Sequence, residues 1–81
     1  MKVYDYEKRR NISGERVRER RLHLRLSQSV LAAKLQTEGI IIERDAITRI
    51  EMGARMVQDY ELRALASALG VTADWLIDLD K

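Results

Sequence analysis

The chain has 81 residues, of which 46% are hydrophobic and 35% are charged, with a formal net charge of +2 at pH 7. This length suffices for one small domain with one core, because autonomous domains usually run from about 50 to 200 residues. A chain this short cannot enclose both a deep substrate cleft and a full core, so we do not expect an enzyme.

Two residue types that carry much of metal and nucleophile chemistry are scarce. The chain has no cysteine, and His23 is its one histidine, so no histidine pair or thiolate site can form within one chain. We therefore expect no metal and no cofactor. Because no apolar run approaches the roughly 18 residues that span a bilayer and the N-terminus is charged, we expect a cytoplasmic protein.

Positive charge is concentrated at the beginning of the chain. Residues 1–25 carry a net charge of +5, residues 26–55 are neutral and residues 56–81 carry −3. Eleven of the fifteen cationic side chains are arginine, whose planar guanidinium pairs with phosphate and with guanine edges. This distribution suits a polyanionic partner, and a solvated basic helix is the alternative.

The first helix is predicted to begin at Ser13, a good N-capping residue, and to run to about Arg25. At about 100° per residue, Val17 and Leu24 share one face, and Arg21 falls at the edge of that face. We expect this face to be buried. Residues 1–11 precede the helix as a basic arm that the sequence does not require to be ordered, and residues 12–81 form the domain.

The second helix is predicted to begin at Ser27 and to end at Gly39. Leu31 and Leu35, four residues apart, should lie on its buried side. The three isoleucines at 40–42 form a β-branched run too short for a helix. We expect an extended linker there, with at least one isoleucine in the core.

Three shorter helices complete the expected order. The third should run from about Arg44 to Met52, with Ile47 and Ile50 buried. The fourth should begin at Asp59, end at Gly70 and bury its apolar i, i+3, i+4, i+7 positions, which are Leu62, Leu65, Ala66 and Leu69. The fifth should open with Thr72 as its N-cap. Since no segment alternates with period two, we expect a compact all-α domain of five helices.

Several of these residues together resemble a known family. They are Ser27, Gln28, Leu31, Ala32, Ile47, Ile50, Glu51, Gly53 and the stretch ELRALASALGVTADWL at 61–76. In this order they are similar to the phage repressor and Cro helix-turn-helix family, also called the xenobiotic-response-element type. The resemblance covers about residues 12–77 and implies that helices two and three form the helix-turn-helix.

The resemblance implies a double-stranded DNA partner, with the third helix in the major groove. A groove about 12 Å wide admits one helix, so side chains on its exposed face reach base edges. The implied base readers are Arg44, Asp45, Thr48 and Arg49. Arginine can fork onto guanine, aspartate can accept from cytosine, and threonine can touch a thymine methyl or a phosphate. Without the motif, this set would be interpreted as a solvated helix face.

Other residues are expected to hold the DNA backbone, because the third helix is nearly neutral. The resemblance assigns phosphate contacts to Ser27 and Gln28, where a helix N-terminus suits an anion. The cations Arg55, Arg9 and Arg10 are further candidates. The resemblance also implies an internal ion pair between Arg21 and Glu51, which would be a scaffold contact.

Two features depart from the pattern of the short phage proteins. Eleven residues separate Leu35 from Ile47, where those versions have about seven, which indicates an elongated turn like that of a bacterial branch of the family. Glu43 also stands where a serine or threonine normally caps the third helix. Glutamate is a poorer cap and brings a negative charge close to the phosphates.

The functional prediction is a sequence-specific regulator, most simply a repressor that binds a palindromic operator as a homodimer. Trp75 and Leu76 are expected to complete the core. The apolar residues near the C-terminus together also offer a possible dimer surface: Trp75, Leu76, Ile77 and Leu79. The alternative is a protein-interaction module, or the antitoxin of a toxin and antitoxin pair, with a toxin or anti-repressor as partner. The neutral third helix and Glu43 motivate that alternative.

Overall fold

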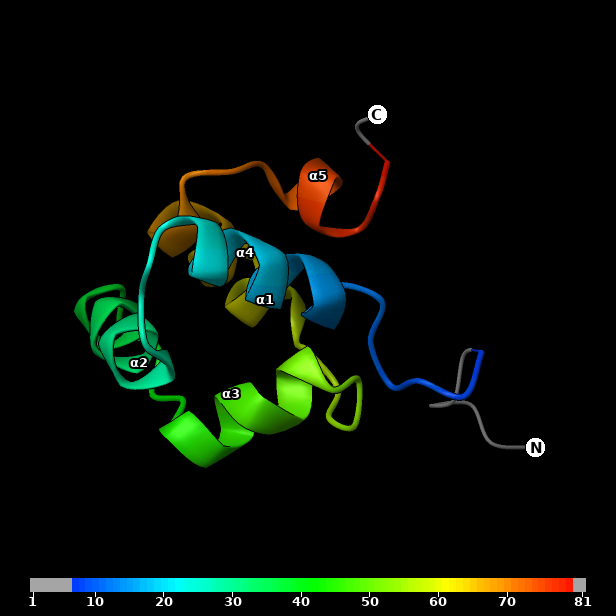
Figure 1. The fold of residues 1–81 in the computed structure, drawn as a ribbon, viewed down its shortest axis with the longest axis horizontal. Helices are drawn as coiled ribbons and strands as arrows, with labels where there is room; N and C mark the ends of the chain where they lie inside the picture. Colours follow the sequence, from blue (N-terminus) through cyan, green and yellow to red (C-terminus); the bar gives the residue numbers. More distant parts are fainter. Residues whose placement is uncertain (1–6, 80–81) are drawn as a thin grey trace.

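The computed structural model describes residues 7–79 of the chain. These residues form five α-helices and no strand, which confirms the all-α class (Figure 1). The helices are α1 (Gly14–His23), α2 (Gln28–Thr37), α3 (Arg44–Glu51), α4 (Asp59–Leu69) and α5 (Ala73–Leu76). Their order and approximate bounds are those predicted from the caps and the apolar periodicity.

All five helices pack around one apolar core. Helix α1 contacts α3, α4 and α5, while α2 contacts α3 and α4, so α1 and α4 hold the helix-turn-helix pair in place (Figure 1). The buried apolar residues come from every helix and from the linker before α3: Val17, Leu31, Leu35, Ile42, Ile47, Ile50, Ala64, Leu65, Ala66, Leu69 and Leu76. Removal of these side chains from water is the main favourable term in folding.

The start of α1 differs from the prediction. Ser13 precedes the helix, but its side chain accepts no capping hydrogen bond. Asn11 caps instead, because its Oδ1 accepts from the backbone N–H of Gly14 at 2.7 Å. The Asn11 amide also donates to the carbonyl oxygens of Ile50 (3.0 Å) and Arg55 (2.7 Å). One side chain thus joins the beginning of α1 to the end of α3.

Helix α1 ends two residues earlier than predicted, in a tight turn before α2. Arg25 has a φ of +59°, in the left-handed region that glycine adopts most easily. The backbone N–H of Leu26 donates to the carbonyl of Arg21, and that of Arg25 to the carbonyl of Leu22, as in a Schellman motif. Leu24 is partly exposed, so it is not the buried residue that the helical wheel predicts.

Both ends of α2 are as predicted. Ser27 Oγ accepts from the N–H of Val30 at 3.0 Å, and Gly39 takes a φ of +81° after the last turn. In the linker that follows, Ile42 is buried while Ile41 is 74% exposed. One isoleucine therefore anchors the linker in the core, as expected.

Helices α4 and α5 are held by local caps. Glu61 Oε1 accepts from the backbone N–H of Gln58 at 2.9 Å, which satisfies a donor at the start of α4. Thr72 Oγ1 accepts from the N–H of Trp75 at 3.0 Å and caps α5. On α4, Leu62 is half-buried, unlike the fully buried Leu65 and Leu69. The predicted apolar residues therefore lie on the side of α4 that faces the core, as expected.

Candidate nucleic-acid interface

The exposed face of α3 carries the side chains that the resemblance assigns to base reading. Arg44, Asp45 and Arg49 are exposed and Thr48 is half-buried, while Ile47, Ile50 and Glu51 on the opposite side are buried. The periodicity of the helix therefore separates a face that packs from a face that can meet a ligand. Arg44 and Asp45 form a weak surface ion pair at 3.7 Å.

The opposite side of α3 is fastened to α1 by Arg21 and Glu51. The Arg21 side chain donates through Nε and Nη2 to the two carboxylate oxygens of Glu51, at 2.7 and 3.0 Å. The two side chains are 9% and 3% exposed, so the ion pair is largely shielded from water. The hydrogen bonding of the Arg21 guanidinium to the Glu51 carboxylate is the largest influence on the pKa of Arg21 and raises it, against the opposing effect of burial.

The start of α2 lies beside this ion pair and touches the edge of the α3 face. Gln28 Nε2 donates to Glu51 Oε1 at 3.1 Å, and Gln28 Oε1 accepts from the Thr48 hydroxyl at 3.0 Å. The Gln28 amide, assigned to phosphate by the resemblance, is therefore engaged within the protein. Ser27 is exposed beside it, with its Oγ in the cap of α2.

Arg55, one of the expected phosphate contacts, is paired within the protein. Its guanidinium donates to both oxygens of the buried Glu61 carboxylate, at 3.0 and 3.1 Å, and to the carbonyl of Met56 at 2.9 Å. These contacts make Arg55 the partner of a buried acid at the start of α4. Arg55 and Glu61 stand on either side of the beginning of α4 in the sequence. Their spacing alone does not distinguish this pair from other pairs of opposite charge.

Hydrogen bonding explains the pKa of Glu61. Burial alone would raise the pKa of this carboxyl, but the Arg55 guanidinium, the Gln58 N–H and the Arg55 charge together lower it below its ordinary value. The hydrogen bond with Glu61 correspondingly raises the pKa of Arg55. Both groups are therefore stabilised in their charged forms.

The described part of the N-terminal arm, residues 7–11, packs against the domain. The Arg10 backbone N–H donates to the carbonyl of Gly53 at 2.8 Å, and the Arg9 side chain lies against Gly53. Arg9 also pairs with Glu7 and Glu15 at 3.5 and 3.7 Å. Residues 1–6 of the expected arm lie outside the described part. Asn11, the last residue of the predicted arm, joins the beginning of α1 to the end of α3 through its side-chain hydrogen bonds.

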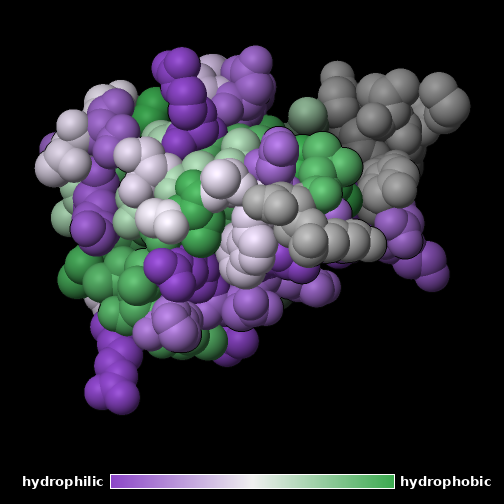
Figure 2. Space-filling model, turned by 90° about the horizontal axis from the view of Figure 1, so that it is seen from above, coloured by the Kyte–Doolittle hydropathy of each residue, from purple (hydrophilic) through white to green (hydrophobic). Residues whose placement is uncertain are grey.

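The four C-terminal apolar residues do not lie together on the surface. Leu76 is fully buried, as expected for a residue that completes the core, and is not available to a dimer surface. Trp75 is half-buried, with the Arg16 guanidinium 4.5 Å from its ring centroid. Ile77 is half-buried and Leu79 is 70% exposed. The isoleucine-rich run and the other helices also expose apolar side chains, and Figure 2 shows separate apolar patches among polar groups.

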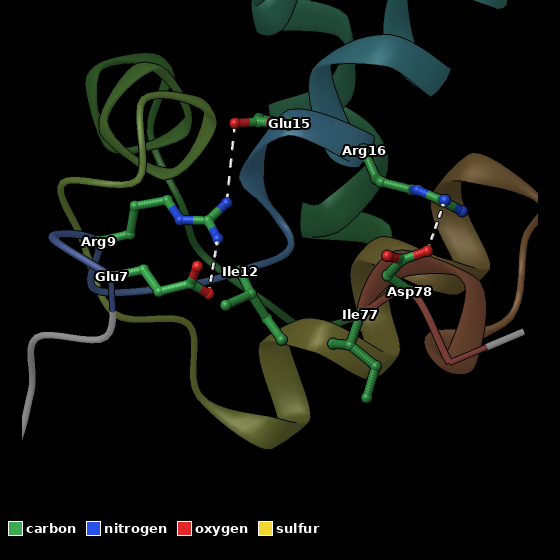
Figure 3. A pocket seen from close by; sticks show the side chains of 7 residues that line it. All are labelled: Glu7, Arg9, Ile12, Glu15, Arg16, Ile77 and Asp78. Carbon is green, nitrogen blue, oxygen red and sulfur yellow. Dashed lines mark hydrogen bonds and ion pairs between the residues drawn. The ribbon is translucent and has the colours of Figure 1, made fainter.

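A shallow hollow of about 300 Å³ lies between the arm, α1 and the end of α5 (Figure 3). Ile12 and Ile77 line it, and charged side chains surround them. Arg16 donates to Asp78 Oδ1 at 2.8 Å on one side, and Arg9 pairs with Glu7 and Glu15 on the other (Figure 3). The hollow is thus apolar at its centre and carries charges of both signs at its rim.

Residues 17–76 match the model of a protein family described as helix-turn-helix. The chain belongs to this helix-turn-helix family. The matched range runs from Val17 in α1 to the last residue of α5, so it includes both helices of the motif and the helices that support them. A comparison with curated proteins found no match.

One solved structure is similar to this chain over almost the whole length of the solved chain. It is the crystal structure of the P22 c2 repressor protein in complex with synthetic operator 9T in the presence of Tl+. The TM-score is 0.73 at 28% sequence identity, and the match covers 86% of this chain and 98% of that chain. The fold is therefore that of a phage repressor DNA-binding domain, as the resemblance implied.

No helix within residues 7–79 is long and apolar enough to cross a membrane. The same part of the chain contains no cluster of three histidine or acidic side chains that could hold a metal ion. The exposed α3 face is therefore the candidate site that the family and the geometry share.

Proposed function

We propose that the protein is a sequence-specific DNA-binding transcription regulator that inserts α3 into the major groove. The observation that carries this proposal is the exposed Arg44, Asp45 and Arg49 face, on a helix whose other side is locked to α1 through Glu51. A rigid helix with donors and an acceptor on its free face suits base edges in the groove. The structural likeness to a repressor bound to an operator supports the same function.

Each side chain on this face has a distinct role in the proposal. Arg44 and Arg49 donate to guanine O6 and N7, and Asp45 accepts from cytosine N4. Thr48, at the edge of the face, contacts a base pair through its methyl group and its hydroxyl oxygen. A good bidentate contact discriminates by about 1–3 kcal/mol, so these residues suffice for several base positions.

Backbone contacts come from outside α3 in this proposal. The charges of α3 and the residue before it balance, because two arginines stand against Glu43 and Asp45. The third acid, Glu51, is neutralised by Arg21. The start of α2 at Ser27 and Gln28 directs backbone N–H groups toward a phosphate. Arg9 and Arg10, packed beside Gly53, are further phosphate contacts. Arg55 contributes its charge only in competition with Glu61.

We further propose a homodimer that represses by occupying a palindromic operator, with half-sites about 34 Å apart. The C-terminal end offers two apolar contacts to a second copy: Leu79, which is 70% exposed, and Ile77, which lines the hollow together with Ile12. An apolar centre within a rim of both charge signs can complement a second copy of itself.

Selection from random duplex DNA tests this proposal. The purified chain should enrich a palindromic motif at about 100 mM salt, and the motif should persist at higher salt. Arg44→Ala should relax preference at one base position in each half-site, whereas Lys34→Ala, an exposed cation on α2, should leave the motif unchanged. An enriched motif without two-fold symmetry would contradict the dimer, and a monomer mass in equilibrium sedimentation at high concentration would do the same.

A protein-interaction module, such as an antitoxin, is the second candidate. Glu43 favours this candidate, because the side chain is exposed at the start of α3 and makes no capping hydrogen bond. Its negative charge would lie close to the phosphates of DNA bound by α3. The salt dependence distinguishes the two functions: binding through Z phosphates weakens with a log–log slope of about −0.9Z. Absence of DNA enrichment at both salt concentrations would favour the protein partner.

A further inference from the structure

The hydroxyl of Thr48 is bonded inside the protein, although Thr48 lies at the edge of the proposed base-reading face. Thr48 Oγ1 donates to Gln28 Oε1 at 3.0 Å, and it lies 3.2 Å from the backbone oxygen of Arg44. Both partners are carbonyl oxygens, which only accept hydrogen bonds. A threonine hydroxyl has one proton, so that proton points into the protein in either arrangement.

Glu51 determines which way the Gln28 amide faces. Gln28 Nε2 lies 3.1 Å from Glu51 Oε1, and an ionised carboxylate accepts hydrogen bonds only. If the amide were reversed, two acceptor oxygens would face each other, and a nitrogen would face Thr48. Because Arg21 and burial hold the Glu51 carboxylate in place, Gln28 must present its oxygen to Thr48.

We propose that Gln28 is a specificity-determining residue, because its amide oxygen is the nearer of the two acceptors that keep the Thr48 proton inside the protein, at 3.0 Å against 3.2 Å for the Arg44 carbonyl. Thr48 then offers a base pair its methyl group and its oxygen lone pairs, and no donor. An A·T pair matches both, since thymine presents a C5-methyl and adenine presents the N6 amino donor. Guanine presents the acceptors N7 and O6, which have no donor to meet, and cytosine presents an N4 amino donor but no methyl group. We thus assign Thr48 to an A·T pair.

This inference rests on the proposed function, since it requires α3 to face base pairs. It differs from a phosphate role for Gln28, because a lost phosphate contact weakens binding to all sequences alike. A lost orienting contact changes the base preference at one position in each half-site. The two roles are therefore separable by sequence readout.

The test is random-duplex selection with the full chain and the variant Gln28→Met, which keeps the side-chain length and removes both hydrogen bonds. The wild type should prefer A·T at one position, and the variant should lose about tenfold of the discrimination against guanine there. Preferences at the other positions should not change. Gln36→Met, on the exposed side of α2, is the matched control and should retain the wild-type motif.

Two Thr48 variants test the orientation of the hydroxyl directly. Thr48→Val keeps the methyl group without the hydroxyl and should retain the thymine preference, whereas Thr48→Ser keeps the hydroxyl without the methyl and should weaken it. If the wild type instead prefers guanine at this position and Thr48→Val loses that preference, the hydroxyl donates to DNA and the inference is overturned. Thermal melts followed by circular dichroism establish that each variant is folded.

The failures of the inference and of the proposed function have different signatures. If the wild type enriches a motif and Gln28→Met enriches the same one, the inference is wrong and the proposed function stands. If the wild type enriches no motif, the proposed function itself is wrong.

Discussion

Arg21 on α1 donates two hydrogen bonds, of 2.7 and 3.0 Å, to the carboxylate of Glu51 at the end of α3. The Arg21 Nη1 group also donates to the carbonyl of Leu26 at 2.8 Å, in the turn before α2. One guanidinium therefore connects the three helices that position the proposed DNA-reading face. Planar bidentate geometry of this kind restricts orientation as well as distance.

Loss of one partner of this ion pair should be strongly destabilising. Arg21→Ala leaves a buried carboxylate without its cation, and we expect a loss of about 3–5 kcal/mol in the free energy of unfolding. Urea denaturation followed by circular dichroism measures it. Arg18→Ala, at an exposed position on the same helix, should change stability by less than about 0.5 kcal/mol. Equal effects of the two substitutions would contradict a structural role for Arg21.

Arg55→Ala should also destabilise the fold, by about 1–3 kcal/mol, because it leaves the buried Glu61 carboxylate without its guanidinium donors. Arg63→Ala, exposed on α4, is the control and should be nearly neutral. Urea unfolding measures both. If Arg55→Ala keeps full stability and instead flattens the salt slope of DNA binding by about one unit, Arg55 is a phosphate contact.

The same ion pair predicts a pH dependence. Because the folded state lowers the pKa of Glu61 below its ordinary value of 4.5, its contribution to stability is fully present above that pH. The contribution is lost as the pH falls through the lower folded-state value. Unfolding free energies measured from neutral pH into acid should fall less steeply in Glu61→Gln than in the wild type. Parallel curves would exclude this carboxyl as a source of acid sensitivity.

Gly14→Ala tests the close approach of α1 and α3. A Cβ at this position would overlap the backbone oxygen of Ile50, so α1 must move away and disturb the Asn11 hydrogen bonds. We expect a loss of about 1–3 kcal/mol, even though alanine favours helices. Thermal or urea unfolding measures this loss. A gain in stability would show that the helices separate without cost.

Arg25→Gly should stabilise the protein. The left-handed conformation at φ +59° costs an L-residue about 1–2 kcal/mol, and glycine adopts it without that strain. Part of this gain is offset by the greater freedom of glycine in the unfolded chain, so we expect about 1 kcal/mol at most. Lys34→Gly, in the interior of α2, should instead lose about 1 kcal/mol in the same urea experiment.

Local signals explain why the helices were predictable. Ser27 and Gly39 bound α2 because a side-chain oxygen and a left-handed residue satisfy backbone groups within a few positions of themselves. The period of the apolar residues likewise placed Ile47, Ile50 and Leu65 in the core. The order of the helices, the exposed face of α3 and the likeness to a repressor domain were therefore present in the sequence.

The partners of polar side chains were decided only by the tertiary structure. Asn11 bonds to backbone atoms 39 and 44 positions away, and Gln28 bridges residues 20 and 23 positions away. The pairing of Arg55 with Glu61 was not predicted for a related reason, since a charge does not indicate which group lies beside it. Caps and periodicity act within a few turns of chain, whereas these contacts depend on how the helices cross, which no local pattern specifies.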